Sequence, residues 1–277
     1  QAFQKAGIDV YGDIVLNHKM GADGTEIVNA KEVNRQNTNE IISDDEQIEV
    51  YTLFTFPGRN KKYSDFIWHW YHFDGIDYDE KTHRNTIFLF NQKSWDQEVD
   101  DENGNYDYLM GADIDFTNEE VVKECTNWGK WYLETTKVDG FRLDAVKHIK
   151  SGFMADWIRT MKDTRNDLQC VGEYWNRNLN SLKNYIEKTN STIPLFDVPL
   201  HYNLYEAANS SGYYDLARIF ENTLVKEMPN QAVTFIDNHD TEPGQALYSW
   251  IPDWFKPLAY ALILLRKDGL PCVFYGD

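Results

Sequence analysis

The feature that most constrains the fold is a recurring unit in which a short apolar segment ends in polar residues and a helical stretch follows. The apolar segments lie near residues 8–16, 138–144, 168–173, 195–198, 232–236 and 271–275. The first of them has no clean polar face, as expected for a parallel strand that is buried on both sides. Strands that alternate with helical crossovers predict an α/β fold with a parallel sheet, whose polar strand ends gather at one edge.

Helices are expected between these segments. The first runs from about residue 117 to 136, with Thr117 as its N-cap and Glu120 three residues later. Others are expected near residues 151–166, 180–189 and 255–267, with helical segments between about 202 and 227, and the first six residues look like the end of a helix. Residues 19–116 differ, because Gly, Asn, Asp and aromatic residues replace any long helical period. We expect an inserted, β-rich region there, in which Trp68 and Trp70 pack in the core.

The composition argues against several classes of protein. With 277 residues, 42% of them hydrophobic, the chain is large enough to form a packed core. Its longest apolar run, Pro257 to Leu265, is too short to span a bilayer, so no membrane partner is expected. A net charge of −18 without a basic stripe argues against nucleic acid as a partner. The absence of HExxH and HxH patterns disfavours a transition-metal hydrolase.

The cysteines bear on the redox compartment. Cys125, Cys170 and Cys272 are odd in number and widely spaced, so they suggest neither a disulfide framework nor a CxxC metal site. Buried, reduced thiols are the expected state. An unpaired thiol is a liability outside the cell, which favours a reducing compartment.

Arg142 and Asp144 are two residues apart in the segment 138–144, so both side chains project to the same side of a strand. A neighbouring guanidinium keeps a carboxylate ionised, and a nucleophilic carboxylate requires that state. A structural ion pair at the strand end is the alternative, and this segment alone leaves both interpretations open.

Three carboxylates follow three of the predicted strands: Asp144, Glu173 and Asp240. Glycoside hydrolysis needs two carboxyl groups on either side of the scissile bond, and in a retaining enzyme they lie about 5 Å apart. Histidines at other strand ends, His18 and His239, offer donors to sugar hydroxyls. A doubly wound sheet would also accommodate six strands, but no GxGxxG motif follows a strand, which removes the main reason to prefer a nucleotide-binding fold.

Four ordered segments resemble the signature segments of the α-amylase family of glycoside hydrolases. They are residues 13–18 (DIVLNH), 140–148 (GFRLDAVKH), 172–175 (GEYW) and 235–240 (FIDNHD), and residues 110–116 (MGADIDF) resemble a fifth. The chain is similar to the bacterial liquefying and intracellular α-amylases nearly throughout. The resemblance implies a (β/α)8 TIM barrel, incomplete here with strands 3 to 8 present, and an inserted β-rich domain after the third strand.

The same resemblance implies endo-hydrolysis of α-1,4-glucosidic bonds in starch, glycogen or maltodextrins by a retaining double displacement. Asp144 would be the nucleophile, and Glu173 would be the general acid and then the base, in apolar surroundings that raise its pKa. Asp240 would bind hydroxyls of the distorted sugar and stabilise the oxocarbenium-like transition state. The residues implied to bind substrate are His18, Arg142, Lys147, His148, Trp175 and His239.

The resemblance also implies a calcium ion that clamps the inserted domain onto the barrel. Its ligands would be side-chain oxygens of Asn17, Asp107 and Asp113 and the carbonyl of His148, and oxygen ligands of this kind suit a hard cation. A surface acidic cluster without a metal is the alternative.

Relatives can hold a second metal near Asp74, Asp96 and Asp115. The family pattern often continues with an acid two residues past Asp115, whereas this chain has Thr117 there.

In domain terms, the resemblance assigns residues 1–18 and 117–277 to the catalytic barrel and residues 19–116 to the calcium-associated domain B. The family's first two strands, an aromatic residue that stacks on the −1 sugar, the last barrel helix and the C-terminal β-domain have no counterpart. The chain is therefore expected to be a truncated sequence of a larger enzyme, with two open sheet edges. We expect a monomer that acts on an α-glucan in the cytoplasm, with secretion as the alternative.

Two other functions stay open. A transglycosylase would keep the chemistry but transfer the sugar to another glucan. A glucan-binding protein that has lost catalysis is the third possibility, and the presence of all three carboxylates together with Arg142 argues against it.

Overall fold

The computed structural model describes residues 2–277, and the chain divides into two compact units that meet at Gln169 and Cys170. The six predicted strands are all present. The first unit contains a parallel pair, β1 (Tyr11–Ile14) and β9 (Gly140–Leu143), in which Asp13 lies opposite Arg142. The second contains four neighbouring parallel strands: β10 (Gln169–Gly172), which begins at the boundary, β11 (Leu195–Phe196), β12 (Ala232–Thr234) and β13 (Leu270–Pro271).

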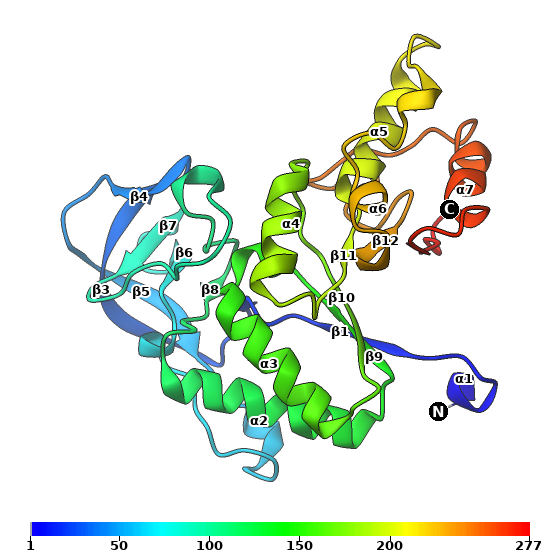
Figure 1. The fold of residues 1–277 in the computed structure, drawn as a ribbon. Coiled ribbons are helices and arrows are strands. Elements are labelled where there is room, and N and C mark those ends of the chain that lie inside the picture. Colours follow the sequence, from blue (N-terminus) through cyan, green and yellow to red (C-terminus); the bar gives the residue numbers. More distant parts are fainter. Residues whose placement is uncertain (1) are drawn as a thin grey trace. The chain divides into compact units, whose positions relative to one another are not determined.

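Residues 18–113 of the first unit form antiparallel sheets, drawn from blue to cyan and green in Figure 1. One short pair joins β2 (His18–Lys19) to β8 (Ala112–Asp113). The larger sheet has the order β4-β3-β7-β6, with β5 also paired to β3; its strands are β3 (Gly24–Asn34), β4 (Asn37–Ile41), β5 (Glu46–Leu53), β6 (Gly75–Asp79) and β7 (Arg84–Phe90). The helical turns here are short: η1 (Pro57–Arg59), η2 (Trp70–His72) and η3 (Glu102–Gly104). The predicted β-rich character is confirmed.

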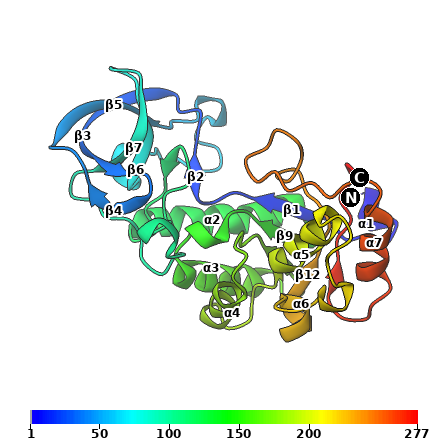
Figure 2. The same ribbon diagram turned by 90° about the horizontal axis from the view of Figure 1, so that it is seen from above.

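Helices connect the parallel strands. In the first unit these are α2 (Glu119–Thr136), η4 (Val146–His148) and α3 (Ser151–Thr164), while α1 (Ala2–Lys5) precedes β1. The helices α2 and α3 lie side by side in Figures 1 and 2. Their close approach depends on Gly129, because a Cβ at that position would come within 2.6 Å of Trp157 and 2.7 Å of Met161. Tyr11 and Asp13 are exposed while Gly12 and Ile14 are buried, so β1 is not buried on both sides as its apolar sequence suggested.

The second unit carries α4 (Leu179–Lys188), α5 (Val198–Asn209), η5 (Leu216–Arg218), α6 (Leu224–Glu227), η6 (Pro229–Gln231) and α7 (Lys256–Leu264). Figure 2 shows α5 and α6 beside β12. The predicted helices are confirmed, although α5 begins earlier than expected and both α3 and α7 end earlier. No helix of residues 2–277 is both long enough and apolar enough to cross a membrane.

The predicted N-cap of α2 is wrong by one residue. The side chain of Asn118, not Thr117, accepts a hydrogen bond from the backbone N–H of Glu120, at 2.9 Å. Thr117 is committed elsewhere, because its hydroxyl and its backbone N–H both donate to Asp115 Oδ1. The side chain of Thr117 is thus directed back to Asp115, and the helix begins one residue later than predicted, with Asn118 as its N-cap.

Asp197 organises the helices of the second unit. Its side chain is fully buried and accepts three backbone hydrogen bonds, from Leu200 (3.1 Å), Leu224 (3.1 Å) and Val225 (2.7 Å). It therefore caps α5 and at the same time ties the start of α6 to it. The side chain of Asp197 thus joins the first turn of α5 to the first residues of α6.

We expect Asp197→Ala to lower the free energy of unfolding by about 3 kcal/mol or more, because it leaves three buried N–H groups without acceptors. Asp215 is a matched control: it caps the short helix η5 by accepting from Ala217, but it is exposed. Asp215→Ala should cost about 1 kcal/mol or less. Urea titration of both variants tests this, and equal losses would contradict a special role for Asp197.

Candidate active site and metal centre

The end of β9 carries the charged pair predicted from sequence. Arg142 Nη1 donates to Asp144 Oδ1 and also to Asp13 Oδ1, the latter at 2.9 Å. The cross-strand register of β1 and β9 explains the second contact, since Asp13 lies directly opposite Arg142. The guanidinium thus stabilises the charge of a half-buried carboxylate, as a nucleophile requires. The role of Asp13 was missed, although it opens the first signature segment.

A strained turn follows Asp144. Ala145 has φ 50° and ψ 36°, the left-handed region that a residue with a Cβ rarely adopts. The turn sends the chain directly from β9 into η4, and the Asp144 N–H stays bonded to the carbonyl of Ile14 at 3.0 Å. Strain of this kind persists where the surroundings enforce it, and it is concentrated at functional sites. Here it fixes the position of Asp144 at the strand end.

His18 lies in the same region of the first unit. Burial lowers its pKa, and the negative charge of Asp144 opposes that shift, which places the two side chains within electrostatic reach of each other. Its Nδ1 is buried and has no hydrogen-bond partner among residues 2–277. A buried ring nitrogen without a protein partner is available to a ligand.

Lys147 and His148 follow in η4, and both are buried. Lys147 Nζ lies 2.9 Å from Glu102 Oε2 and 4.5 Å from the centroid of the Tyr106 ring. His148 Nδ1 donates to the carbonyl of Tyr106 at 2.6 Å, and burial lowers the pKa of this imidazole to about 3. These contacts tie η4 to residues 102–106. A substrate-binding role for these two residues stays a prediction.

The other two predicted catalytic carboxylates belong to the second unit. Glu173 directly follows β10 and is buried, while Asp240 lies beyond β12 and is partly exposed. Because β10, β11 and β12 are parallel neighbours, the two residues leave the same edge of the sheet. His239 Nε2 lies 3.4 Å from Asp240 Oδ2, and Trp175 Nε1 donates to the hydroxyl of Tyr202 at 3.0 Å.

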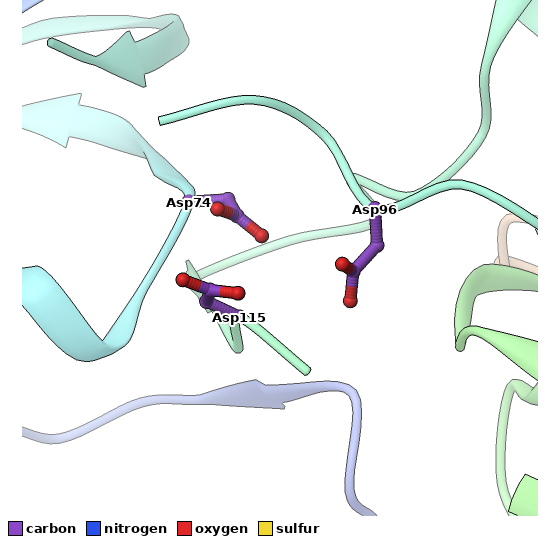
Figure 3. Close-up of side chains that lie close together, drawn as sticks. All are labelled: Asp74, Asp96 and Asp115. Atoms are coloured by element: carbon purple, nitrogen blue, oxygen red, sulfur yellow. The ribbon is translucent and has the colours of Figure 1, made fainter. Parts of the chain in front are cut away.

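The predicted metal ligands gather in the first unit. Carboxylate oxygens of Asp74, Asp107 and Asp113 all lie within 4.8 Å of one another, and so do those of Asp74, Asp96 and Asp115. Figure 3 shows that Asp74, Asp96 and Asp115 come from three separate segments, with the carboxylates of Asp74 and Asp115 side by side. Asp74 is therefore shared by both groups, a relation that the sequence did not reveal.

Backbone pairing explains how these segments meet. Asp74 N–H donates to the carbonyl of Asp113, and Asp115 N–H donates to the carbonyl of His72, so residues 72–74 run antiparallel to residues 113–115. The carbonyl of Asn17 accepts from Ile114, and Asn17 Nδ2 lies 3.4 Å from Asp113 Oδ1. Asn17 and Asp107 thus lie close to Asp113, whereas the carbonyl of His148 as a fourth ligand stays a prediction.

The charge balance of the cluster fits a cation. Burial, followed by the charges of neighbouring aspartates, raises the pKa of Asp74, Asp107 and Asp113. Three of the carboxylate oxygens are buried and have no hydrogen-bond partner in the described part of the chain: Asp74 Oδ2, Asp96 Oδ1 and Asp113 Oδ2. Buried carboxylates in this state are costly unless a cation balances them, and an all-oxygen donor set suits calcium.

Asp115 differs from its neighbours. Burial alone would raise its pKa, but hydrogen bonds from Lys93 and Thr117 outweigh burial and hold the pKa below its ordinary value. Lys93 Nζ donates to Asp115 Oδ2 and, at 2.7 Å, to the carbonyl of Tyr71. In the group of Asp74, Asp96 and Asp115, one carboxylate thus already has a cationic partner. Sequence reasoning missed Lys93, which is 22 residues from Asp115 and carries no motif.

A separate cavity of about 1200 Å³ lies in the first unit beside α2. Its lining includes Trp68, Trp128 and Trp131, and no predicted catalytic, substrate-binding or metal-binding residue among residues 2–277 lines it. Trp68 is buried, with its ring centroid 5.2 Å from that of Phe66 and 5.6 Å from that of Phe73, so core packing is confirmed for this residue. Trp70 is only half-buried, and its ring meets that of Phe90 edge-on at 6.2 Å.

Comparisons with known proteins decide the family. A family model described as the α-amylase catalytic domain matches residues 1–277. The chain belongs to the α-amylase family. It is 57% identical over 280 residues to an α-amylase of Geobacillus stearothermophilus, covering 100% of the chain and 51% of that protein. It is 54% identical over 275 residues to a glucan 1,4-α-maltohexaosidase of Bacillus sp. strain 707, covering 98% and 53%.

The chain therefore spans about half the length of these two relatives. Among solved structures, the cyclomaltodextrin glucanotransferase CldA is similar with a TM-score of 0.64 at 20% sequence identity, covering 99% of the chain and 48% of that protein. This likeness concerns the fold alone. The family assignment made from the signature segments is confirmed, and the alternation of parallel strands and helices is that of a partial barrel.

Proposed function

We propose that this chain carries the catalytic residues of an endo-acting, retaining hydrolase of α-1,4-glucans, that is, an α-amylase. The observation that carries the proposal is the Arg142–Asp144 pair on a strained turn at the end of β9, in a chain of the α-amylase family. The identity of 57% to an α-amylase across the whole chain supports the same reaction.

In the proposed reaction Asp144 attacks the anomeric carbon of an α-linked glucose while Glu173 gives a proton to the departing glycosidic oxygen. A β-linked glycosyl ester forms on Asp144. Glu173, now a carboxylate, then removes a proton from the water that attacks the same carbon, and Asp144 leaves. Two inversions return the α-configuration. Asp240 would bind hydroxyls of the distorted sugar and stabilise the positive charge that develops in both steps.

Substrate contacts are assigned by the same reasoning. His18, with a buried ring nitrogen that has no partner in residues 2–277, and His239 beside Asp240 would bind hydroxyls of the sugar under attack. Arg142 would orient Asp144, and Trp175 would offer a surface on which a neighbouring glucose stacks. Lys147 and His148 would line the leaving-group side.

The domain assignment is part of the proposal. Residues 19–116 would form an inserted domain between the third and fourth strands of the barrel, and calcium would hold it to the barrel. Asn17, Asp107, Asp113 and the carbonyl of His148 would be the ligands, with Asp74 beside them. The ion would supply structural cohesion and would take no part in bond cleavage. At the second group, Lys93 and Thr117 already occupy the oxygens of Asp115.

We infer a cytoplasmic location from the cysteines. All three are free thiols: Cys125 and Cys170 are buried and Cys272 is half-buried. Fractionation of the native source cells, with activity assayed in the cytosol and in the medium, tests this inference.

The native protein should release reducing ends from soluble starch in the presence of calcium, and its first products should be α-anomers. NMR during the first minutes of hydrolysis reads the anomer before mutarotation, so it distinguishes a retaining from an inverting mechanism. First products in the β-configuration would contradict the proposed mechanism.

The same assay tests the rival functions. A transglycosylase would form new, longer oligosaccharides with little rise in reducing ends. A binding protein without catalysis would bind starch and release nothing. Either result from folded, calcium-loaded protein would overturn the hydrolase proposal.

A further inference from the structure

Two adjacent residues of α5 contact both segments of the second unit that carry predicted catalytic carboxylates. His201 Nδ1 lies 2.5 Å from the carbonyl oxygen of Ile236, and His201 Nε2 lies 2.8 Å from Ser249 Oγ. The hydroxyl of Tyr202 accepts from Trp175 Nε1 at 3.0 Å. Residues 236–249 contain Asp240, and Trp175 is two residues from Glu173.

The imidazole of His201 has a defined protonation state. It is fully buried, and burial lowers its pKa to about 4, so the ring is neutral at neutral pH. A carbonyl can only accept, so Nδ1 carries the hydrogen. Nε2 lies 2.8 Å from Ser249 Oγ, whose single hydroxyl hydrogen is shared between Nε2 and the carbonyl of Leu247, also 2.8 Å away. The ring also stacks on Phe235, with centroids 5.2 Å apart and an interplanar angle of 6°. A side chain held by two hydrogen bonds and a stacked ring has one position.

These two hydrogen bonds attach both ends of the Asp240 segment to one side chain. Inside the segment, Ser249 N–H donates to the carbonyl of Thr241 at 3.2 Å, and Thr241 Oγ1 lies 3.0 Å from Asp237 Oδ1. Asp240 N–H donates to Asn238 Oδ1 at 3.1 Å. The segment is thus a closed loop, and His201 joins its ends to α5.

The Glu173 segment is held by the neighbouring residue. Tyr202 receives the hydrogen bond from Trp175, and the guanidinium of Arg177 lies 3.5 Å from the centroid of the Tyr202 ring. The ring centroid of Trp175 is 5.7 Å from that of His201 and 6.0 Å from that of Phe235, both at tilted angles, so the two segments also meet through aromatic contacts. The helix that carries both residues is itself anchored by Asp197.

We propose that His201 is a positioning residue, which holds the segment of Asp240 in a fixed place relative to the segment of Glu173. The inference rests on the proposed function, because it concerns two carboxylates of the same reaction. A displacement of about 1 Å in a catalytic constellation can cost on the order of 100-fold in rate. A buried side chain that touches neither substrate nor reacting atoms can therefore control the chemical step.

Three variants of the full native protein separate the contacts. His201→Phe keeps an aromatic ring but loses both hydrogen bonds, and His201→Asn keeps a donor near Ile236. Ser249→Ala removes the partner of Nε2 together with the hydrogen bond from Ser249 Oγ to the carbonyl of Leu247. For His201→Phe we expect kcat on maltooligosaccharides to fall roughly 10- to 100-fold, with KM changed less than about threefold. His201→Asn and Ser249→Ala should show smaller losses of kcat. These kinetics are measured well below each melting temperature.

Thr189→Val is the matched control for lost stability. Thr189 is fully buried, and its hydroxyl donates within α4 to the carbonyls of Tyr185 and Ile186. This variant removes a buried hydrogen bond whose partners are carbonyls of α4 and not residues of either segment, so kcat should not change. The proposal would be overturned if His201→Phe kept kcat within about threefold of the native value, or if Thr189→Val lost as much.

Hydrogen exchange separates failure of this inference from failure of the proposed function. In His201→Phe the amides of residues 237–249 should exchange at least about tenfold faster, while those of residues 140–148 keep their native rates. If the native protein hydrolyses no α-glucan, the proposed function fails, and the catalytic part of the inference fails with it. If exchange in residues 237–249 is unchanged, His201 does not hold the segment, whatever the activity.

Discussion

Asp144→Asn should abolish nearly all α-glucan hydrolysis by the native protein, with kcat lowered on the order of 10⁴-fold or more and glucan binding nearly unchanged. An amide has the shape of the carboxylate but cannot attack the anomeric carbon. Folding should be preserved, because the Asn oxygen can still accept from Arg142, and Arg142 keeps its second partner, Asp13. Steady-state kinetics and a starch-binding assay measure the two quantities.

Asp13→Asn is the matched control. It changes the other carboxylate bound to Arg142, but the side chain of Asp13 is mostly exposed and lies outside the proposed bond-forming step. A loss of less than about tenfold is expected, since only the orientation of Arg142 is affected. If Asp13→Asn were as inactive as Asp144→Asn, a disturbed charge balance around Arg142 would explain both losses. The result would then no longer support Asp144 as the nucleophile.

Glu173→Gln should also lose nearly all turnover on starch, for a different reason. Glutamine cannot protonate the departing oxygen, whereas a substrate with an acidic aryl leaving group needs no proton. Such a substrate should recover formation of the glycosyl ester in Glu173→Gln but not in Asp144→Asn. Recovery in both variants, or in neither, would contradict the division of roles.

Chelation of calcium should lower the melting temperature of the native protein by about 10 °C, if calcium is present beforehand at about 100 times its dissociation constant or more. The physical reason is the buried cluster around Asp113, where Asp74, Asp96 and Asp107 add further negative charge. Calorimetry with saturating calcium and with chelator measures the difference.

Asp113→Asn tests whether this cluster is the calcium site. The variant removes one ligand and one charge, so it should melt at a lower temperature with calcium but lose little more on chelation. Asn17→Ala should weaken calcium retention in the same direction, because it removes a neutral ligand. Asp163→Asn, an exposed acid on α3, is the control and should keep the full difference. If chelation lowered the melting temperature of Asp113→Asn as much as that of the native protein, the calcium site would lie elsewhere.

Much of the fold and of the candidate site could be predicted from local sequence. Three apolar segments have the composition of buried parallel strands: one ends in Asp144, one ends in Glu173, and one precedes Asp240. Each contains a strand in the structure. The Arg142–Asp144 contact follows from a spacing of two on one strand. One error arose within a local pattern: Thr117 is a residue type that favours an N-cap, but it donates to Asp115, two residues earlier, and Asn118 caps the helix instead.

The sequence by itself determined the family, the order of strands and helices and the identity of the chemical groups, because these depend on short patterns and on motifs of fixed spacing. Only the tertiary structure decided that Asp74 is shared by two groups of carboxylates, that Lys93 neutralises Asp115, and that His201 joins both ends of the Asp240 segment to α5. The physical reason is that these contacts join residues 22 to 48 positions apart. Their geometry depends on strand register and on how loops close, and hydrophobic periodicity does not encode either.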